Sequence, residues 1–115
     1  MVKNKGKFNL PKDEILRGRE TFDQVFERGE KLTGKNVSIF YCQAESRKIG
    51  FVVSKRVKKA VNRNRYKRLL REIYRLNKDS FPEKGHIILL ARGTSDDFWL
   101  LQSEILGILN KTNYI

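Results

Sequence analysis

Residues 59–76 read KAVNRNRYKRLLREIYRL, and this stretch decides how the chain folds. At about 100° per residue, its apolar side chains gather on one side of a helix and most of its lysines and arginines on the other. The apolar stripe consists of Tyr66, Leu69, Leu70, Ile73 and Leu76. Such a stripe needs a core to pack against, so the pattern predicts a long amphipathic helix inside a folded domain. Val57 and Val61 miss the stripe, so the pattern leaves the first residue of the helix open.

Strand patterns lie on both sides of this helix. Residues 37–42 and 48–54 alternate between two faces, and the polar segment between them favours a hairpin. Residues 86–91 form a short apolar run between glycines, which is typical of a buried central strand. The residues before Val37, around Gly34, leave room for one more short strand. Phe40 shares its face with Ser38 and Cys42, and we expect this face to be incompletely buried.

Two further helices complete the pattern. Phe22, Val25 and Phe26 share one helical face and predict a helix over about residues 19–28. After Asp96 and Asp97, apolar residues repeat at helical spacing up to residue 109. The order helix, strand, strand, helix, strand, helix predicts an α+β fold, a small mixed sheet with packed helices. At 115 residues we expect a flexible basic arm over residues 1–12 and a single domain over residues 13–115.

The positive charge is concentrated in one segment. The chain has 25 Lys and Arg against 13 Asp and Glu, a net charge of +12. Residues 55–75 alone hold ten of the bases and a single acid, Glu72. A solvated helix face normally mixes the two signs, so this segment indicates a polyanionic partner, nucleic acid first and an anionic membrane second.

Composition narrows the class further. The longest apolar run, residues 87–91, is too short to span a bilayer. The single cysteine, Cys42, rules out an internal disulfide. The N-terminus is basic and lacks the apolar segment of a secretory signal, so we expect a cytoplasmic protein.

A set of motifs, in order along the chain, resembles the protein component of bacterial ribonuclease P. The hallmark is Arg63-Asn64-Arg65, followed by Lys67-Arg68 and Arg71-Glu72. Upstream lie Phe22-x-x-Val25-Phe26-x-x-Gly29 and the strand-like stretch 50–55, GFVVSK, and downstream lies Leu90-Ala91-Arg92. The resemblance covers roughly residues 13–110, and it implies that residues 13–115 form a single RNA-binding domain.

The resemblance implies both a fold and a function. The fold would be like domain 2 of ribosomal protein S5, with a left-handed strand–helix–strand crossover that base rates disfavour. The function would be that of the protein subunit of the ribonucleoprotein that removes the 5′ leader from precursor tRNA. The residues that would bind the ribozyme RNA are Lys55, Arg56, Lys59, Arg63, Asn64, Arg65, Lys67, Arg68 and Arg71. The residues that would form a separate leader-binding cleft are Phe22, Phe26, Phe40, Val52 and Ser54. From spacing alone, two phenylalanines four residues apart are more often core residues than ligands.

No catalytic group is evident in the chain itself. His86 begins a buried-looking strand, and Cys42 has no visible base partner. Asp96 and Asp97 are explained better by a helix N-terminus than by a hydrated Mg²⁺ site. In the family the RNA subunit binds the Mg²⁺ that performs hydrolysis, so we expect no cofactor on the protein alone. The expected partners are that RNA and the precursor tRNA leader, with no membrane and no small-molecule substrate.

Two alternatives remain open from the sequence. A general RNA-binding or ribosomal protein of the same fold would explain the charge, though not the whole set of motifs in order. A peripheral membrane protein with a basic amphipathic helix is the other alternative, although strands on both sides of the helix need its apolar face.

Overall fold

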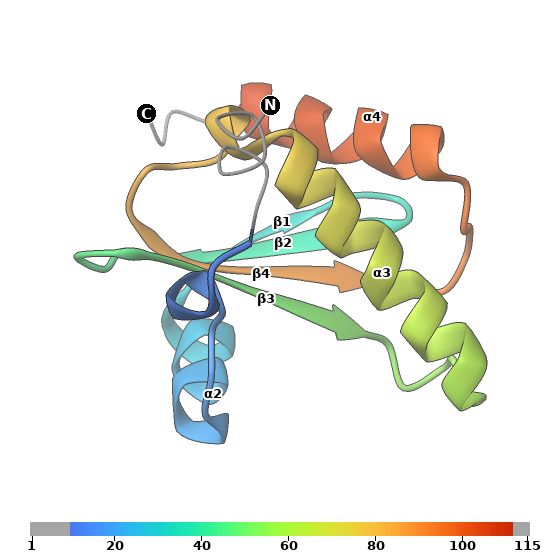
Figure 1. Ribbon diagram of the computed structural model, residues 1–115, viewed down its shortest axis with the longest axis horizontal. Coiled ribbons are helices and arrows are strands. Elements are labelled where there is room, and N and C mark those ends of the chain that lie inside the picture. Colours follow the sequence, from blue (N-terminus) through green and yellow to red (C-terminus); the bar gives the residue numbers. More distant parts are fainter. Residues whose placement is uncertain (1–9, 112–115) are drawn as a thin grey trace.

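The computed structural model describes residues 10–111, which form a four-stranded sheet with helices on both faces (Figure 1). The strands are β1 (Glu30–Thr33), β2 (Val37–Cys42), β3 (Arg47–Val53) and β4 (Gly85–Ala91). The helices are α2 (Arg19–Arg28), α3 (Ala60–Leu76) and α4 (Phe98–Asn110), with short 3-10 turns η1 (Lys12–Glu14) and η2 (Lys78–Ser80). The mixed α+β fold is confirmed. Of the predicted basic arm, residues 1–9 lie outside the described residues, and Lys12 already belongs to η1.

The sheet order is β1-β2-β4-β3, so β4 lies between β2 and β3. It pairs antiparallel with β2 and parallel with β3. The predicted hairpin between residues 37–42 and 48–54 is therefore wrong. The physical reason is that the apolar run of β4 is buried on both faces and occupies the sheet centre, which separates the two alternating strands. The short extra strand before Val37 is confirmed as β1, which pairs antiparallel with β2.

The connection from β3 through α3 to β4 is the left-handed crossover that the family resemblance implied. In Figure 1, β3 and β4 both run to the right, and α3 returns to the left in front of the sheet. β4 then runs above β3, which gives the path its left hand. This arrangement places α3 across the sheet, where it contacts both β3 and β4.

Helices α3 and α4 cover one face of the sheet. Leu70, Ile73 and Tyr74 of α3 are fully buried against Ile49 and Leu89 of the sheet. Asp97 caps α4, because its Oδ1 accepts a hydrogen bond of 3.2 Å from the Leu100 N–H. The interpretation of Asp97 as part of a helix N-terminus is thus confirmed.

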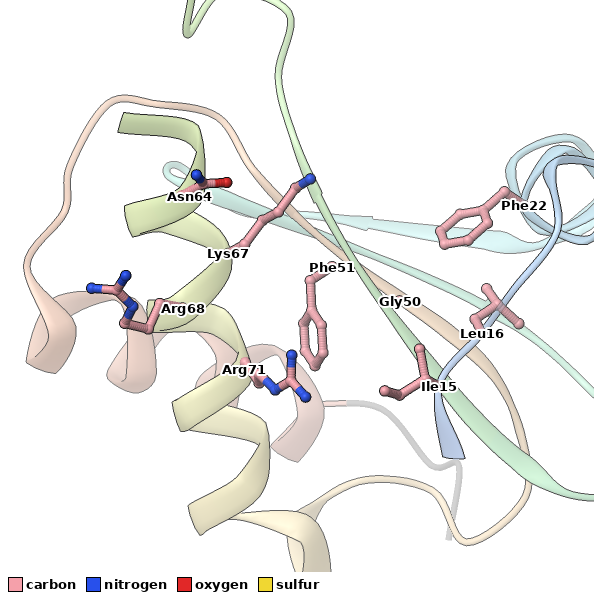
Figure 2. A pocket seen from close by; sticks show the side chains of 9 residues that line it. All are labelled: Ile15, Leu16, Phe22, Gly50, Phe51, Asn64, Lys67, Arg68 and Arg71. Atoms are coloured by element: carbon pink, nitrogen blue, oxygen red, sulfur yellow. The ribbon is translucent and has the colours of Figure 1, made fainter. Parts of the chain in front are cut away.

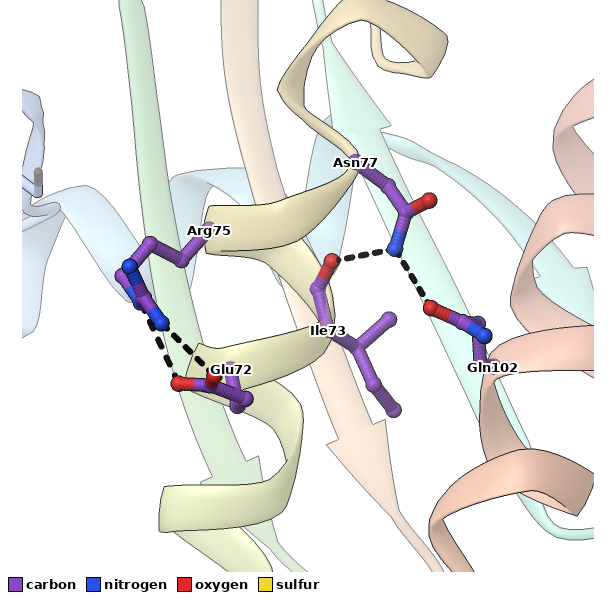
Figure 3. A network of polar contacts seen from close by, with 5 residues as sticks. All are labelled: Glu72, Ile73, Arg75, Asn77 and Gln102. Carbon is purple, nitrogen blue, oxygen red and sulfur yellow. Dashed lines mark hydrogen bonds and ion pairs between the residues drawn. The ribbon is translucent and has the colours of Figure 1, made fainter. Parts of the chain in front are cut away.

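The C-terminal end of α3 is tied to α4 by a side-chain amide. Figure 3 shows the Asn77 Nδ2 group donating to the Ile73 carbonyl and to Gln102 Oε1 of α4, both at 2.8 Å. In the same view, Arg75 and Glu72 form an ion pair of 2.7 Å within α3. This end of the helix is therefore fixed in place, and its opposite end faces the connection from β3.

Helix α2 covers the other face of the sheet, and this overturns one expectation. Phe40 is only 8% exposed, because the Phe26 ring packs edge-on against it with centroids 4.8 Å apart. Ser38 on the same face is fully buried. The expectation of an incompletely buried face is wrong at Phe40 and Ser38, since α2 packs over the cluster of Leu16, Phe40 and Ile88. It is confirmed at Cys42, which is half-buried.

Candidate nucleic-acid interface

A groove of about 550 Å³ runs along the outer edge of β3. Since β3 is the last strand of the sheet, only one of its edges is covered by β4. At the other edge, the Leu16 N–H donates to the Ile49 carbonyl at 2.8 Å. The groove is lined by Ile15, Leu16, Phe22, Gly50, Phe51, Asn64, Lys67, Arg68 and Arg71 (Figure 2).

The groove has one apolar and one cationic wall. Figure 2 shows Phe22 and Leu16 on one side, and the α3 side chains of Lys67, Arg68 and Arg71 on the other. The α3 residues are spaced three and four apart, so one face of the helix presents them together. Such a groove can hold phosphates on one wall and stack an unpaired base on the other.

The cations of this wall are not neutralised by acids. Within residues 10–111, ion pairs join Arg65 to Asp96 at 3.4 Å, Arg75 to Glu72 at 2.7 Å and Lys78 to Glu14 at 3.5 Å. None of these pairs involves a residue of the groove, and no lining residue is acidic. The groove therefore has a positive potential available to an anionic ligand.

The structure brings together four of the predicted RNA ligands in this groove and gathers others nearby. Asn64, Lys67, Arg68 and Arg71 are exposed and line it. Near the start of α3, a second hollow of about 360 Å³ is lined by Arg56, Lys59 and Arg65 among others. Lys55 is exposed on the connection that leads to this hollow. Arg63 differs from the rest, because it is partly buried and its guanidinium donates to backbone carbonyls.

The predicted leader-binding residues are less uniform. Phe22 lines the groove itself. Phe26 is 37% exposed on α2, whereas Phe40 and Val52 belong to the cluster beneath that helix. Ser54 follows β3, and its Oγ accepts a hydrogen bond of 3.2 Å from the Arg56 N–H. The two surfaces predicted as separate thus meet at Phe22.

Sequence reasoning missed four lining residues, Ile15, Leu16, Gly50 and Phe51. Gly50 carried a usable signal, since a glycine inside a strand often marks a close approach of another group. Here a Cβ on Gly50 would lie 2.7 Å from the Phe22 ring. No pattern in the sequence predicts that residues 15–16 lie at the edge of β3.

The remaining candidate groups do not form a reactive cluster. Across the described part of the chain, no three His, Cys, Asp or Glu side chains are placed to hold a metal ion. Partial burial and the nearby charge of Lys48 lower the pKa of His86. No helix between residues 10 and 111 has the length and apolarity to cross a membrane.

A mixed α+β domain with an unneutralised cationic groove beside an aromatic ring defines a nucleic-acid-binding protein. The profile of the family described as Ribonuclease P matches residues 10–113. The ribonuclease P protein component of Dictyoglomus thermophilum is 40% identical over 112 residues, covering 92% of this chain and 93% of the relative. That of Alkaliphilus oremlandii is 38% identical, covering 87% and 91%. The structure of the RNase P protein from Thermotoga maritima superposes with a TM-score of 0.76 at 29% identity, covering 87% of this chain and 98% of that one.

The chain belongs to the ribonuclease P protein family and is a subunit of that tRNA-processing ribonucleoprotein. A general RNA-binding or ribosomal protein is not favoured, because the family profile, the relatives and the solved fold agree over most of the chain.

Proposed function

We propose that this protein docks on the RNA subunit of ribonuclease P through α3 and holds the 5′ leader of precursor tRNA beside Phe22. The observation that carries the proposal is the groove in which the acid-free cationic wall of α3 faces an aromatic ring. The proposed setting is the cytoplasm, since a lone cysteine is compatible with a reducing compartment.

The RNA subunit is the proposed partner of the cationic face of α3 and of the connection before it. Exposed cations of this helix and of the connection before it face outward, including Lys55, Arg56, Lys59 and Arg65. The stretch 63–75 is about 18 Å long at about 1.5 Å per residue, so it can follow a folded phosphate backbone. Recognition would then depend on shape and phosphate position more than on base sequence.

The leader is the proposed occupant of the β3 groove. Lys67, Arg68 and Arg71 supply charge and donors for phosphates, and Asn64 supplies both a donor and an acceptor for a sugar or base edge. Phe22 supplies the stacking surface, Phe26, Phe40 and Val52 make up or support the α2 side, and Ser54 lies just after β3. Because the two surfaces meet here, the groove is the proposed point where the leader leaves the RNA subunit.

The protein contributes binding to the reaction, and the RNA subunit contributes catalysis. Mg²⁺ held by the RNA would activate the water that hydrolyses the phosphodiester bond. The groove lining has no carboxylate, imidazole or thiol, so it offers no general base of its own. Its cations instead reduce repulsion between RNA phosphates.

Reconstitution with the cognate RNA subunit and a labelled precursor tests the proposal. We expect the full-length protein to increase leader cleavage at limiting Mg²⁺, and Arg68→Ala to weaken this gain. The gain should be larger for a long leader than for a leader of one nucleotide. No gain at low Mg²⁺, or Mg²⁺-dependent cleavage by the protein without RNA, would contradict the assignment.

A further inference from the structure

Arg63 differs from the other predicted RNA ligands on α3, because its guanidinium donates to backbone carbonyls of the preceding connection. The other predicted cations of this helix and its approach are exposed, whereas Arg63 is partly buried. It lies in the first turn of α3, where its backbone N–H bonds the Lys59 carbonyl at 3.0 Å. The surroundings of Arg63 therefore indicate a role different from that of the exposed cations of α3.

The guanidinium of Arg63 holds three backbone carbonyls of the preceding connection. Nη1 donates to the Ser54 carbonyl at 3.0 Å and to the Val57 carbonyl at 2.8 Å, and Nη2 donates to the Val53 carbonyl at 3.2 Å. These carbonyls lie at the end of β3 and at the far side of the turn that follows it. One side chain therefore fixes both ends of this turn.

The turn carries two exposed cations. Within it, the Val57 N–H donates to the Ser54 carbonyl at 3.0 Å, and the Arg56 N–H donates to Ser54 Oγ at 3.2 Å. Lys55 and Arg56 project from this short loop into solvent. A loop ordered before binding loses less conformational freedom when its side chains meet phosphates.

We propose that Arg63 is a positioning residue, whose guanidinium clamps the 53–57 turn so that Lys55 and Arg56 are presented to RNA. This inference rests on the proposed function, since it assumes that Lys55 and Arg56 contact phosphates. Lysine cannot replace arginine here, because a single ammonium cannot span three carbonyls in the planar geometry of a guanidinium. A charge-conserving substitution therefore separates clamping from simple attraction of phosphate.

The test is a mutant cycle read out by the salt dependence of binding to the cognate RNA subunit. The full-length variants are Arg63→Lys, the double variant Lys55→Ala/Arg56→Ala and the triple combination. Each lost phosphate contact flattens the slope of log affinity against log salt by about 0.7–0.9. We expect the double variant to flatten it by about 1.4–1.8, from two contacts. Arg63→Lys should approach the same value despite its intact charge, and the triple variant should add nothing further.

The matched control is Arg28→Lys, at the last residue of α2, which packs on the opposite face of the sheet from α3 and lies outside both hollows. Since Arg28 is exposed, its lysine variant keeps the charge and should stay close to the wild-type slope. The inference is overturned if Arg63→Lys also keeps the wild-type slope while Arg63→Ala, added to the double variant, flattens the salt slope by about a further 0.7–0.9. That pair of results is the behaviour of a direct phosphate ligand.

A second measurement decides the case if Arg63→Lys does not fold. In the wild-type protein without RNA, NMR should find the Arg63 guanidinium protons and the Val57 amide proton protected from solvent exchange. Guanidinium protons that exchange freely and become protected only when RNA is added would refute the clamp. If Arg68→Ala and the double variant both bind RNA like wild type, the proposed function fails instead.

Discussion

Replacing Phe22 by leucine separates the role of this ring in the groove from its role in the core. Phe22 is partly buried, packs against the cluster of Leu16 and Val25, and also lines the groove opposite Arg68. Alanine would disturb both roles at once. Truncating a buried phenylalanine costs about 3–5 kcal/mol, so a half-buried one should cost about 2 kcal/mol, or about 8–16 °C in Tm for a domain of this size.

Leucine keeps most of the apolar volume and removes the flat ring. The stability cost of Phe22→Leu should therefore stay below about 1.5 kcal/mol. Stacking of a base on an aromatic ring contributes about 1–3 kcal/mol, so loss of the ring should weaken leader binding by about 5-fold to 150-fold.

The assay compares two precursors with the reconstituted holoenzyme. One carries a long leader and the other a single leader nucleotide, and the ratio of their KM values isolates the leader contacts. Phe81→Leu is the matched control, because Phe81 is 1% exposed in the cluster beneath α3 and distant in sequence from the groove lining. We expect this control to lower Tm and leave the KM ratio unchanged. The reasoning is refuted if Phe22→Leu lowers Tm in the same way and also leaves the ratio at its wild-type value.

Three further outcomes are expected. Glu104→Ala should lower the free energy of unfolding by about 3 kcal/mol in urea denaturation, because the carboxylate accepts hydrogen bonds of 2.8–3.0 Å from the Asn36 N–H, Asn36 Nδ2 and Val37 N–H; a wild-type midpoint would contradict this. Partial burial and the charge of Lys48 lower the pKa of His86 in the folded protein, so this imidazole binds a proton more readily in the unfolded chain. The free energy of unfolding should therefore fall as pH drops below about 6.5. His86→Gln should lose that part of the pH dependence, and an unchanged profile would exclude His86 as its source. Gly50→Ala should displace the Phe22 ring and weaken leader binding, because the added Cβ would lie 2.7 Å from ring carbons; wild-type binding by a folded variant would show that the ring position is unimportant.

Local pattern predicted the elements well because each of them is set by its own residues. Helix α2 spans Arg19–Arg28 and β2 spans Val37–Cys42, as the periodicity indicated. The pairing of the strands was different, because alternation shows which residues share a face and says nothing about which strand lies alongside. The run at residues 87–91 contained the missing information, since a strand buried on both faces needs a neighbour on each edge.

The site was predicted in parts, and the fold determined how the parts combine. Charge counting found the cations of α3, and the family resemblance found Phe22, but neither indicated that they face each other across the edge of β3. That relation depends on the hand of the crossover and on residues 15–16 at the strand edge, both of which are tertiary features. Arg63 shows the same limit at a single position, since its charge is visible in the sequence and its three carbonyl partners are not.

The like charges on α3 destabilise its helical conformation, and the packing of its apolar side stabilises it. Lys67 and Arg71 are like charges one turn apart, an arrangement that destabilises an isolated helix by a few tenths of a kcal/mol per pair. The opposite side of the helix offsets this cost, because burial of a large apolar side chain contributes about 1.5–3 kcal/mol and Leu70, Ile73 and Tyr74 are all fully buried. Two acids pair with arginines of α3: Asp96 with Arg65 and Glu72 with Arg75. The cations between these two arginines, which face the groove, are left without a counter-charge. Added salt should therefore relieve repulsion in the free protein while it weakens RNA binding, and this opposition follows from placing unpaired cations on a well-anchored helix.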